Sequence, residues 1–109
     1  MKLRVGNRHF DWWTMGLGSI EHRTGVVALV ARPGDDAGET KLLDATVADD
    51  MCEVAKRWAE DGRLRRDEPG PVVGLITLAA ERREAVGIVH ALLRRGWLYA
   101  EPVFDDLFV

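Results

Sequence analysis

The sequence predicts an α+β domain in which an antiparallel sheet carries two main helices. Three observations predict this class. Short runs of β-favouring residues recur along the chain, two longer segments repeat apolar residues with helical spacing, and glycine or proline separates these segments. The 109 residues suit a single domain over 1–109, because a chain of this size buries a modest core without disulfide or metal support.

The first expected element is a β-hairpin. The segments KLRV and RHFDW flank Gly6-Asn7, which favours a tight two-residue turn. Counting outward from this turn gives an apolar face, with pairs Val5–Arg8, Leu3–Phe10 and Met1–Trp12, and a polar face, with pairs Lys2–Asp11 and Arg4–His9. Trp13 then falls on the polar side. Such a hairpin covers a core on one side only.

Two strands are expected in the middle of the chain. The run VVALVA after Gly25 predicts a strand buried on both faces, and Pro33-Gly34 ends it. Thr40 to Asp44 predict a short strand antiparallel to that run. Residues 14–25 contain three glycines, so we expect a loop there, followed by an edge strand over 20–24.

The first helix is expected from Thr46 to Asp61, with a box-like cap formed by Thr46 and Asp49 and a stop at Gly62. Its large apolar residues form one stripe: Val47, Met51, Val54 and Trp58. A second ridge carries small residues: Ala48, Cys52, Ala55 and Ala59. This ridge suits close packing against the second helix or, alternatively, a dimer contact.

Val72 to Thr77 predict a buried strand, and Thr77 then caps a second helix that runs to Arg95 and stops at Gly96. The inward residues of this helix are expected to be Leu78, Ala85, Val86, Val89, Leu92 and Leu93. A basic stripe is expected to face outward: Arg83, Gly87, His90 and Arg94. Residues 97–104 predict an edge strand, in which Pro102 limits further pairing.

From Val26 onward, this order of elements resembles the ferredoxin-like arrangement, in which two helices cover one face of an antiparallel sheet, here with an extra hairpin in front. The alternative makes residues 72–80 a helix. Helices over 46–61, 72–80 and 82–95, followed by a wing, then resemble a winged-helix domain in the second half. The β-favouring residues of VVGLIT favour the strand.

Composition excludes several classes of function. The single Cys52 excludes an internal disulfide and a zinc site made of cysteines alone. Fifteen basic and 18 acidic residues give a net charge of −3, which exerts no strong pull on nucleic acid or anionic lipid. The sequence shows no long apolar run and no apolar leader, so we expect a cytoplasmic protein without membrane contact.

Signals for catalysis are weak. The sequence has no phosphate-binding or dinucleotide fingerprint, and Cys52 and Ser19 lack an activating context, so we predict no catalytic, cofactor-binding or metal-binding residue. His9 and Asp11 share a strand face, and a third ligand from His22 or His90 would complete a metal site. A small metal-dependent enzyme or sensor is therefore the third hypothesis.

The second hypothesis is a winged-helix regulator that binds DNA. Its phosphate contacts would come from the basic residues of the second helix: Arg82, Arg83, His90, Arg94 and Arg95. Acidic residues in the wing, Glu101, Asp105 and Asp106, oppose such binding because they repel phosphate.

The leading hypothesis is a non-catalytic protein-interaction domain that binds a protein partner or a second copy of itself as a homodimer. Its role would be that of an adaptor, inhibitor, immunity factor or assembly component. Four tryptophans and many arginines supply the side chains that most often anchor interfaces. The expected partner-binding residues are Trp13, Arg4, His9, Arg83, His90, Arg94, Phe104 and Phe108.

Overall fold

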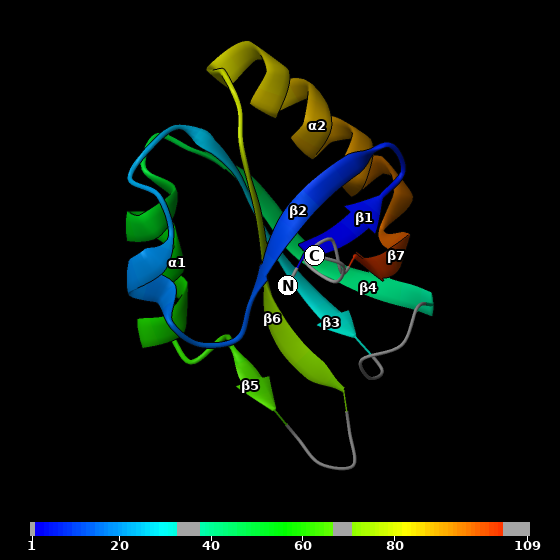
Figure 1. Ribbon diagram of the computed structural model, residues 1–109, viewed down its shortest axis with the longest axis horizontal. Helices are drawn as coiled ribbons and strands as arrows, with labels where there is room; N and C mark the ends of the chain where they lie inside the picture. Colours follow the sequence, from blue (N-terminus) through cyan, green and yellow to red (C-terminus); the bar gives the residue numbers. More distant parts are fainter. Residues whose placement is uncertain (1, 33–37, 67–70, 104–109) are drawn as a thin grey trace, which may run out of the picture.

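Six strands of the described chain form a closed antiparallel β-barrel (Figure 1). The computed structural model describes residues 2–32, 38–66 and 71–103. Around the barrel, the strands follow the order β1, β2, β6, β3, β4 and β7, and β7 pairs with β1 to complete the ring. Their bounds are β1 Lys2–Val5, β2 Arg8–Trp13, β3 Gly25–Arg32, β4 Gly38–Ala48, β6 Val72–Ala79 and β7 Trp97–Val103. A two-residue strand, β5 Arg65–Arg66, pairs with the start of β6.

The closed barrel shows that the expected ferredoxin-like open sheet is wrong. Residues Lys2–Val5 of β1 pair with Arg8–Asp11 of β2, and Asp11–Trp13 then pair with Leu75–Thr77 of β6. The hairpin therefore joins two other strands of the sheet and is not an addition in front of it. The winged-helix alternative is also wrong, because residues 72–79 form a strand that pairs with β3 along its whole length.

The expected hairpin register is confirmed for every pair inside the described residues. The observed pairs are Lys2–Asp11, Leu3–Phe10, Arg4–His9 and Val5–Arg8. Gly6 adopts a φ of 64°, which the tight turn requires and which glycine reaches without steric cost. The Met1–Trp12 pair lies outside the described residues. The register expected from the turn is therefore the one that the folded chain adopts over these residues.

Gly74 allows β2 to approach β6 where the barrel closes. A Cβ atom at this position would lie 2.7 Å from both the Trp12 ring and the Trp13 carbonyl oxygen, and 3.1 Å from Cγ2 of Thr14. The carbonyl oxygen is backbone and cannot rotate away. The pairing of β2 with β6 therefore depends on the missing side chain of Gly74.

Helix α2, Arg82–Arg95, covers one end of the barrel and completes its interior core (Figure 1). The side chains that it buries are Ala85, Ile88, Val89 and Leu92. They pack against the inward-facing residues of the strands, which include Leu3, Phe10, Val26, Ala28, Val30, Ile76 and Leu98. Val86 and Leu93 were expected to face inward, but both are exposed, because Ile88 and not these two residues completes the buried stripe.

Helix α1, Met51–Glu60, packs on the outer surface of the barrel (Figure 1). Its small residues Cys52 and Ala55 are fully buried, and they share an apolar cluster with Val27 and Leu29 of β3. The small ridge therefore lies against the barrel wall and a 3-10 turn at Leu17–Ser19, not against the second helix as expected. Neither helix in the described ranges is long and apolar enough to cross a membrane.

β3 is buried on both faces, as expected, because α2 and the interior core cover one face and α1 covers the other. β4 pairs antiparallel with β3, which confirms the expected direction. However, β4 continues to Ala48, opposite Gly25, so the predicted start of the first helix at Thr46 is wrong. The helix begins at Met51, where Asp50 supplies the cap.

Three further boundaries differ from expectation. α2 begins at Arg82 and not near Thr77, because β6 extends to Ala79. The predicted edge strand over 20–24 does not form in this described segment, which connects the 3-10 turn to β3. β7 is not an edge strand, because it pairs with β4 at Trp97–Ala100 and with β1 at Ala100–Val103.

Replacement of Gly74 by alanine is expected to destabilise the fold. The added methyl group overpacks the seam between β2 and β6, so Gly74→Ala should lower the free energy of unfolding by about 1–3 kcal/mol. Gly87→Ala is the matched control, because a Cβ there meets nothing within 4 Å on an exposed helix face. It should raise stability by about 0.5–1 kcal/mol. Urea denaturation measures both changes, and equal effects at the two sites would contradict the role of Gly74.

Candidate functional site

The outward face of α2 brings together three of the predicted site residues. Arg83, His90 and Arg94 are all exposed there, together with Gly87, as expected from helical spacing. The same face carries Val86, which is 39% exposed, and Leu93, which is 51% exposed. At about 100° per residue, this set spans about 120° of the helix circumference. It is a continuous surface of mixed apolar and basic character, which we call the α2 outer face.

The charge on the α2 outer face has one sign. Two arginines and one histidine lie on it, and the glutamates of the helix region, Glu81 and Glu84, lie outside it at the amino-terminal end. Arg82 also lies outside this arc, and its guanidinium forms an ion pair with Asp49. The α2 outer face is therefore suited to a partner that is apolar and acidic.

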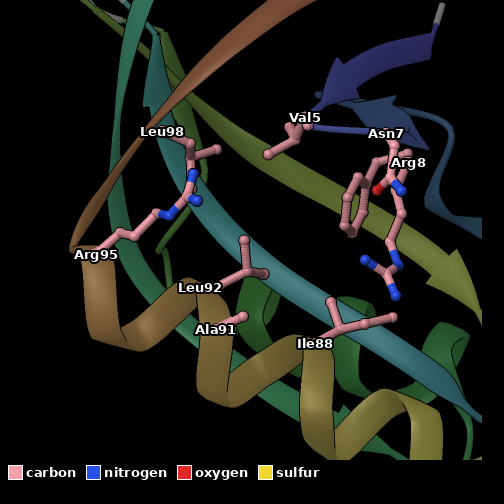
Figure 2. Close-up of a pocket in the computed structure, with 10 residues that line it drawn as sticks. Val5, Asn7, Arg8, Ile88, Ala91, Leu92, Arg95 and Leu98 are labelled. Carbon is pink, nitrogen blue, oxygen red and sulfur yellow. The ribbon is translucent and has the colours of Figure 1, made fainter.

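A cleft of about 160 Å³ lies between the hairpin turn and α2 (Figure 2). Its floor consists of core side chains, including Phe10, Leu92 and Leu98. Arg8 from β2 and Arg95 from the end of α2 stand at its rim. Sequence reasoning did not identify this cleft, because no local pattern places residue 8 near residue 95.

A polar hollow of about 310 Å³ contains His9 and Trp13, two of the predicted residues. Asp11 lines it as well, so the expected common face of His9 and Asp11 is confirmed. The third ligand proposed for a metal is not there: among the described residues, neither His22 nor His90 joins this pair in a three-ligand group. The hollow is therefore a polar surface feature without the metal constellation that the sequence suggested.

Trp13 is half-buried and takes part in the closure of the barrel. Its Nε1 donates a hydrogen bond of 2.9 Å to Oγ1 of Thr77, which lies on β6. The ring packs against the outer cluster around α1. These contacts give Trp13 a structural role in addition to the partner-binding role that the sequence suggested.

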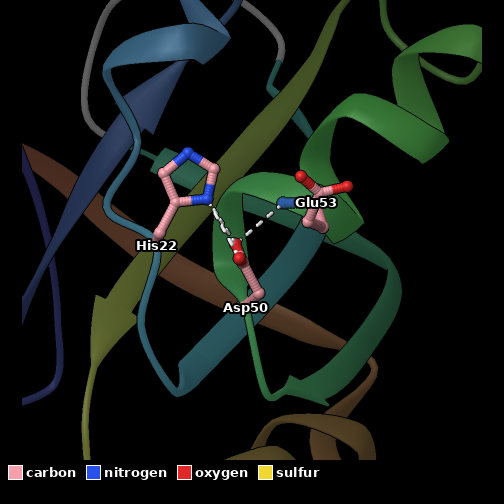
Figure 3. A group of neighbouring side chains, drawn as sticks. All are labelled: His22, Asp50 and Glu53. Atoms are coloured by element: carbon pink, nitrogen blue, oxygen red, sulfur yellow. Dashed lines mark hydrogen bonds and ion pairs between the residues drawn. The ribbon is translucent and has the colours of Figure 1, made fainter.

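His22, Asp50 and Glu53 form the one group of three potential metal ligands found in the described ranges (Figure 3). His22 Nδ1 lies 2.9 Å from Asp50 Oδ2, and Asp50 Oδ1 accepts a hydrogen bond of 3.1 Å from the Glu53 backbone N–H. Two hydrogen bonds lower the pKa of Asp50 below its ordinary value: the bond from His22 has the larger effect, and the bond from the Glu53 backbone N–H has the smaller one. Capping of α1 accounts for this geometry, and the positive end of the helix dipole opposes a cation there.

Arg4 lies on an outer wall of the barrel that neither helix covers. Its guanidinium forms an ion pair with Glu101 of β7, opposite it in the sheet. Tyr99, two residues before Glu101, is 54% exposed on the same wall, and sequence reasoning missed it. Strand alternation gives the signal that was available, because Leu98 and Ala100 on either side are buried. Phe104 and Phe108 lie outside the described residues.

The hydrogen bond between Trp13 and Thr77 can be tested by a double-mutant cycle. Trp13→Phe and Thr77→Val each remove one partner, so each should lower the free energy of unfolding by about 1 kcal/mol. The free energy of unfolding of the double variant should fall by less than the sum of the two single losses, because the two side chains interact directly. Strictly additive losses in urea denaturation would show that this bond contributes nothing.

The helix cap predicts a specific dependence of stability on pH. The lowered pKa of Asp50 means that its charged form stabilises the fold above the ordinary value of 3.8 and that this stability is lost as pH falls through the lowered pKa. Asp50→Asn keeps a capping oxygen but removes the charge. The free energy of unfolding of this variant should therefore fall less steeply than that of the wild type as the pH decreases. Unfolding by urea from about pH 2 to 6 measures this. Asp49→Asn is the control for the loss of a neighbouring charge. If the free energy of unfolding changes with pH equally steeply in the wild type and in Asp50→Asn, the charged cap at Asp50 does not stabilise the fold.

Searches against protein-family models, curated proteins and solved structures found no match for this chain. The geometry, exposure and charge of the described residues therefore carry the functional proposal.

Proposed function

We propose that this protein is a small non-catalytic interaction domain that binds an apolar, acidic segment of another protein through the α2 outer face. The observation that carries the proposal is that the apolar stripe of α2 extends beyond the side chains that the barrel buries. Val86 and Leu93 lie beside the buried Val89 on the helix surface, three residues before it and four residues after it, and both are in solvent. Exposed apolar side chains that continue a buried stripe favour a packing partner.

The shape of the α2 outer face supports docking. Val86 and Leu93 are seven residues apart and therefore lie two turns apart on one side of the helix. Gly87 lies nearby, and space for a Cβ atom is open there, so a partner backbone can approach closely at that point. Apolar anchors beside a small residue are the usual composition of a helix-packing surface.

The charges support a partner of different sequence over a second copy of this chain. In an antiparallel pairing of two α2 outer faces, Arg83 of one copy would approach Arg94 of the other. Like charges across an interface weaken binding and discriminate against the wrong partner. A partner with carboxylates at its rim would instead form ion pairs with both arginines, and His90 supplies a further polar contact.

This function fits the roles expected from the sequence: adaptor, inhibitor, immunity factor or assembly component. In each of them, binding is the whole activity. The exposure of three of the predicted residues on the α2 outer face, Arg83, His90 and Arg94, supports this proposal.

Site-specific photo-crosslinking in cells of the source organism tests this proposal. A photoreactive amino acid at position 93 should crosslink a defined protein, whereas the same group at Met15, which is 75% exposed on another part of the surface, should not. With that protein purified, Leu93→Asp and Arg83→Glu should each weaken binding by about tenfold or more. Met15→Asp should leave binding unchanged, and all variants should keep the wild-type melting temperature.

Two outcomes would contradict the proposal. Equal crosslinking from positions 93 and 15 would show that the α2 outer face is not a preferred contact. Concentration-dependent dimerisation in sedimentation experiments, abolished by Leu93→Asp, would show that a second copy and not a different protein covers this face.

A further inference from the structure

The cleft between the hairpin and α2 has the character of a small-ligand site. Its volume of about 160 Å³ is close to that of a cavity of ~150 Å³ that holds a benzene molecule. Val5 and Phe10 line it from the hairpin, and Ile88 and Leu92 line it from α2 (Figure 2). The interior can therefore accept a phenyl ring or a branched alkyl group of similar size.

The rim of this cleft is cationic. Figure 2 shows Arg8 reaching down from the hairpin and Arg95 reaching inward from the end of α2, on opposite sides of the space. Within the part of the chain that the structure describes, neither guanidinium takes part in an ion pair, and no acidic residue lines the cleft. Asn7, at the turn between β1 and β2, adds a side-chain amide to the rim.

We propose that this cleft binds a small organic carboxylate that carries one phenyl-sized or branched aliphatic group. The apolar group would contact Phe10 and Leu92, and the carboxylate would lie at the rim, where planar guanidinium groups bind carboxylates with paired hydrogen bonds. An apolar pocket with a few polar groups at its edge is the usual form of such sites. The limited volume excludes larger ligands from full burial.

This site is separate from the α2 outer face and goes beyond the proposed function. Arg95 follows Arg94 in the sequence, but one residue turns the side chain by about 100° around the helix axis. Arg94 therefore lies on the outer face, and Arg95 lies at the cleft. A ligand in the cleft contacts α2 from the flank and leaves the outer face free.

Calorimetric titration and amide NMR shifts with 3-phenylpropionate and with 4-methylpentanoate test the proposal on the intact chain. At least one acid should bind saturably and shift amides of the hairpin turn and of the second half of α2. Its neutral amide should bind at least tenfold more weakly. Arg8→Gln and Arg95→Gln should each weaken binding of the acid by about tenfold, because each removes a charge-assisted hydrogen bond.

Arg94→Gln is the matched control, because it removes the same charge one residue away and outside the cleft, and it should leave binding unchanged. Ala91→Leu narrows the cleft from an exposed position without altering its charge and should abolish binding. Equal affinity for acid and amide, equal effects of Arg94→Gln and Arg95→Gln, or no saturable binding of either acid would overturn the assignment. None of these results depends on the protein partner.

Discussion

The structure depends on the pairing of β2 with β6, because this pairing closes the barrel. β2 is short, yet it pairs with two strands: its first part pairs with β1 and its last part pairs with β6. Trp12 and Trp13 point to opposite sides of the wall, as successive strand residues must. Trp12 packs on the inner core with the Arg32 guanidinium 5.1 Å from its ring centre, and Trp13 donates to Thr77 outside. Gly74 has no side chain and therefore leaves space for the Trp12 ring and the Trp13 carbonyl oxygen.

Closure of the barrel determines which part of it each of the two helices covers. α2 covers one end of the barrel and adds its buried apolar side chains to the interior core. α1 lies outside and makes β3 a strand with apolar contacts on both faces. A helix that covers a barrel end buries only one side, so the remaining sides of α2 meet solvent. Both surfaces proposed for binding are consequences of this placement.

Several arginines of the described chain form ion pairs, and those of the two proposed surfaces do not. Arg4, Arg63 and Arg82 are neutralised by neighbouring carboxylates, whereas Arg8 and Arg95 have no ion-pair partner among the described residues. The chain as a whole has a charge of −3, so these positive regions are local and not a general property of its surface. Local positive charge beside exposed apolar groups favours ligands that are themselves apolar and anionic.

The sequence by itself determined the hairpin register, the doubly buried β3, the strand over 72–77 and the end of α2 at Gly96, because turn chemistry and side-chain periodicity act over a few residues. It also placed Arg83, His90 and Arg94 on one exposed helix face. Only the tertiary structure decided that the sheet closes, that Val86 and Leu93 stay in solvent, and that Arg8 meets Arg95 at a cleft. Closure of the sheet depends on contacts such as that between Trp13 and Thr77, 64 residues apart, and local patterns carry no information about which distant strand edges pair.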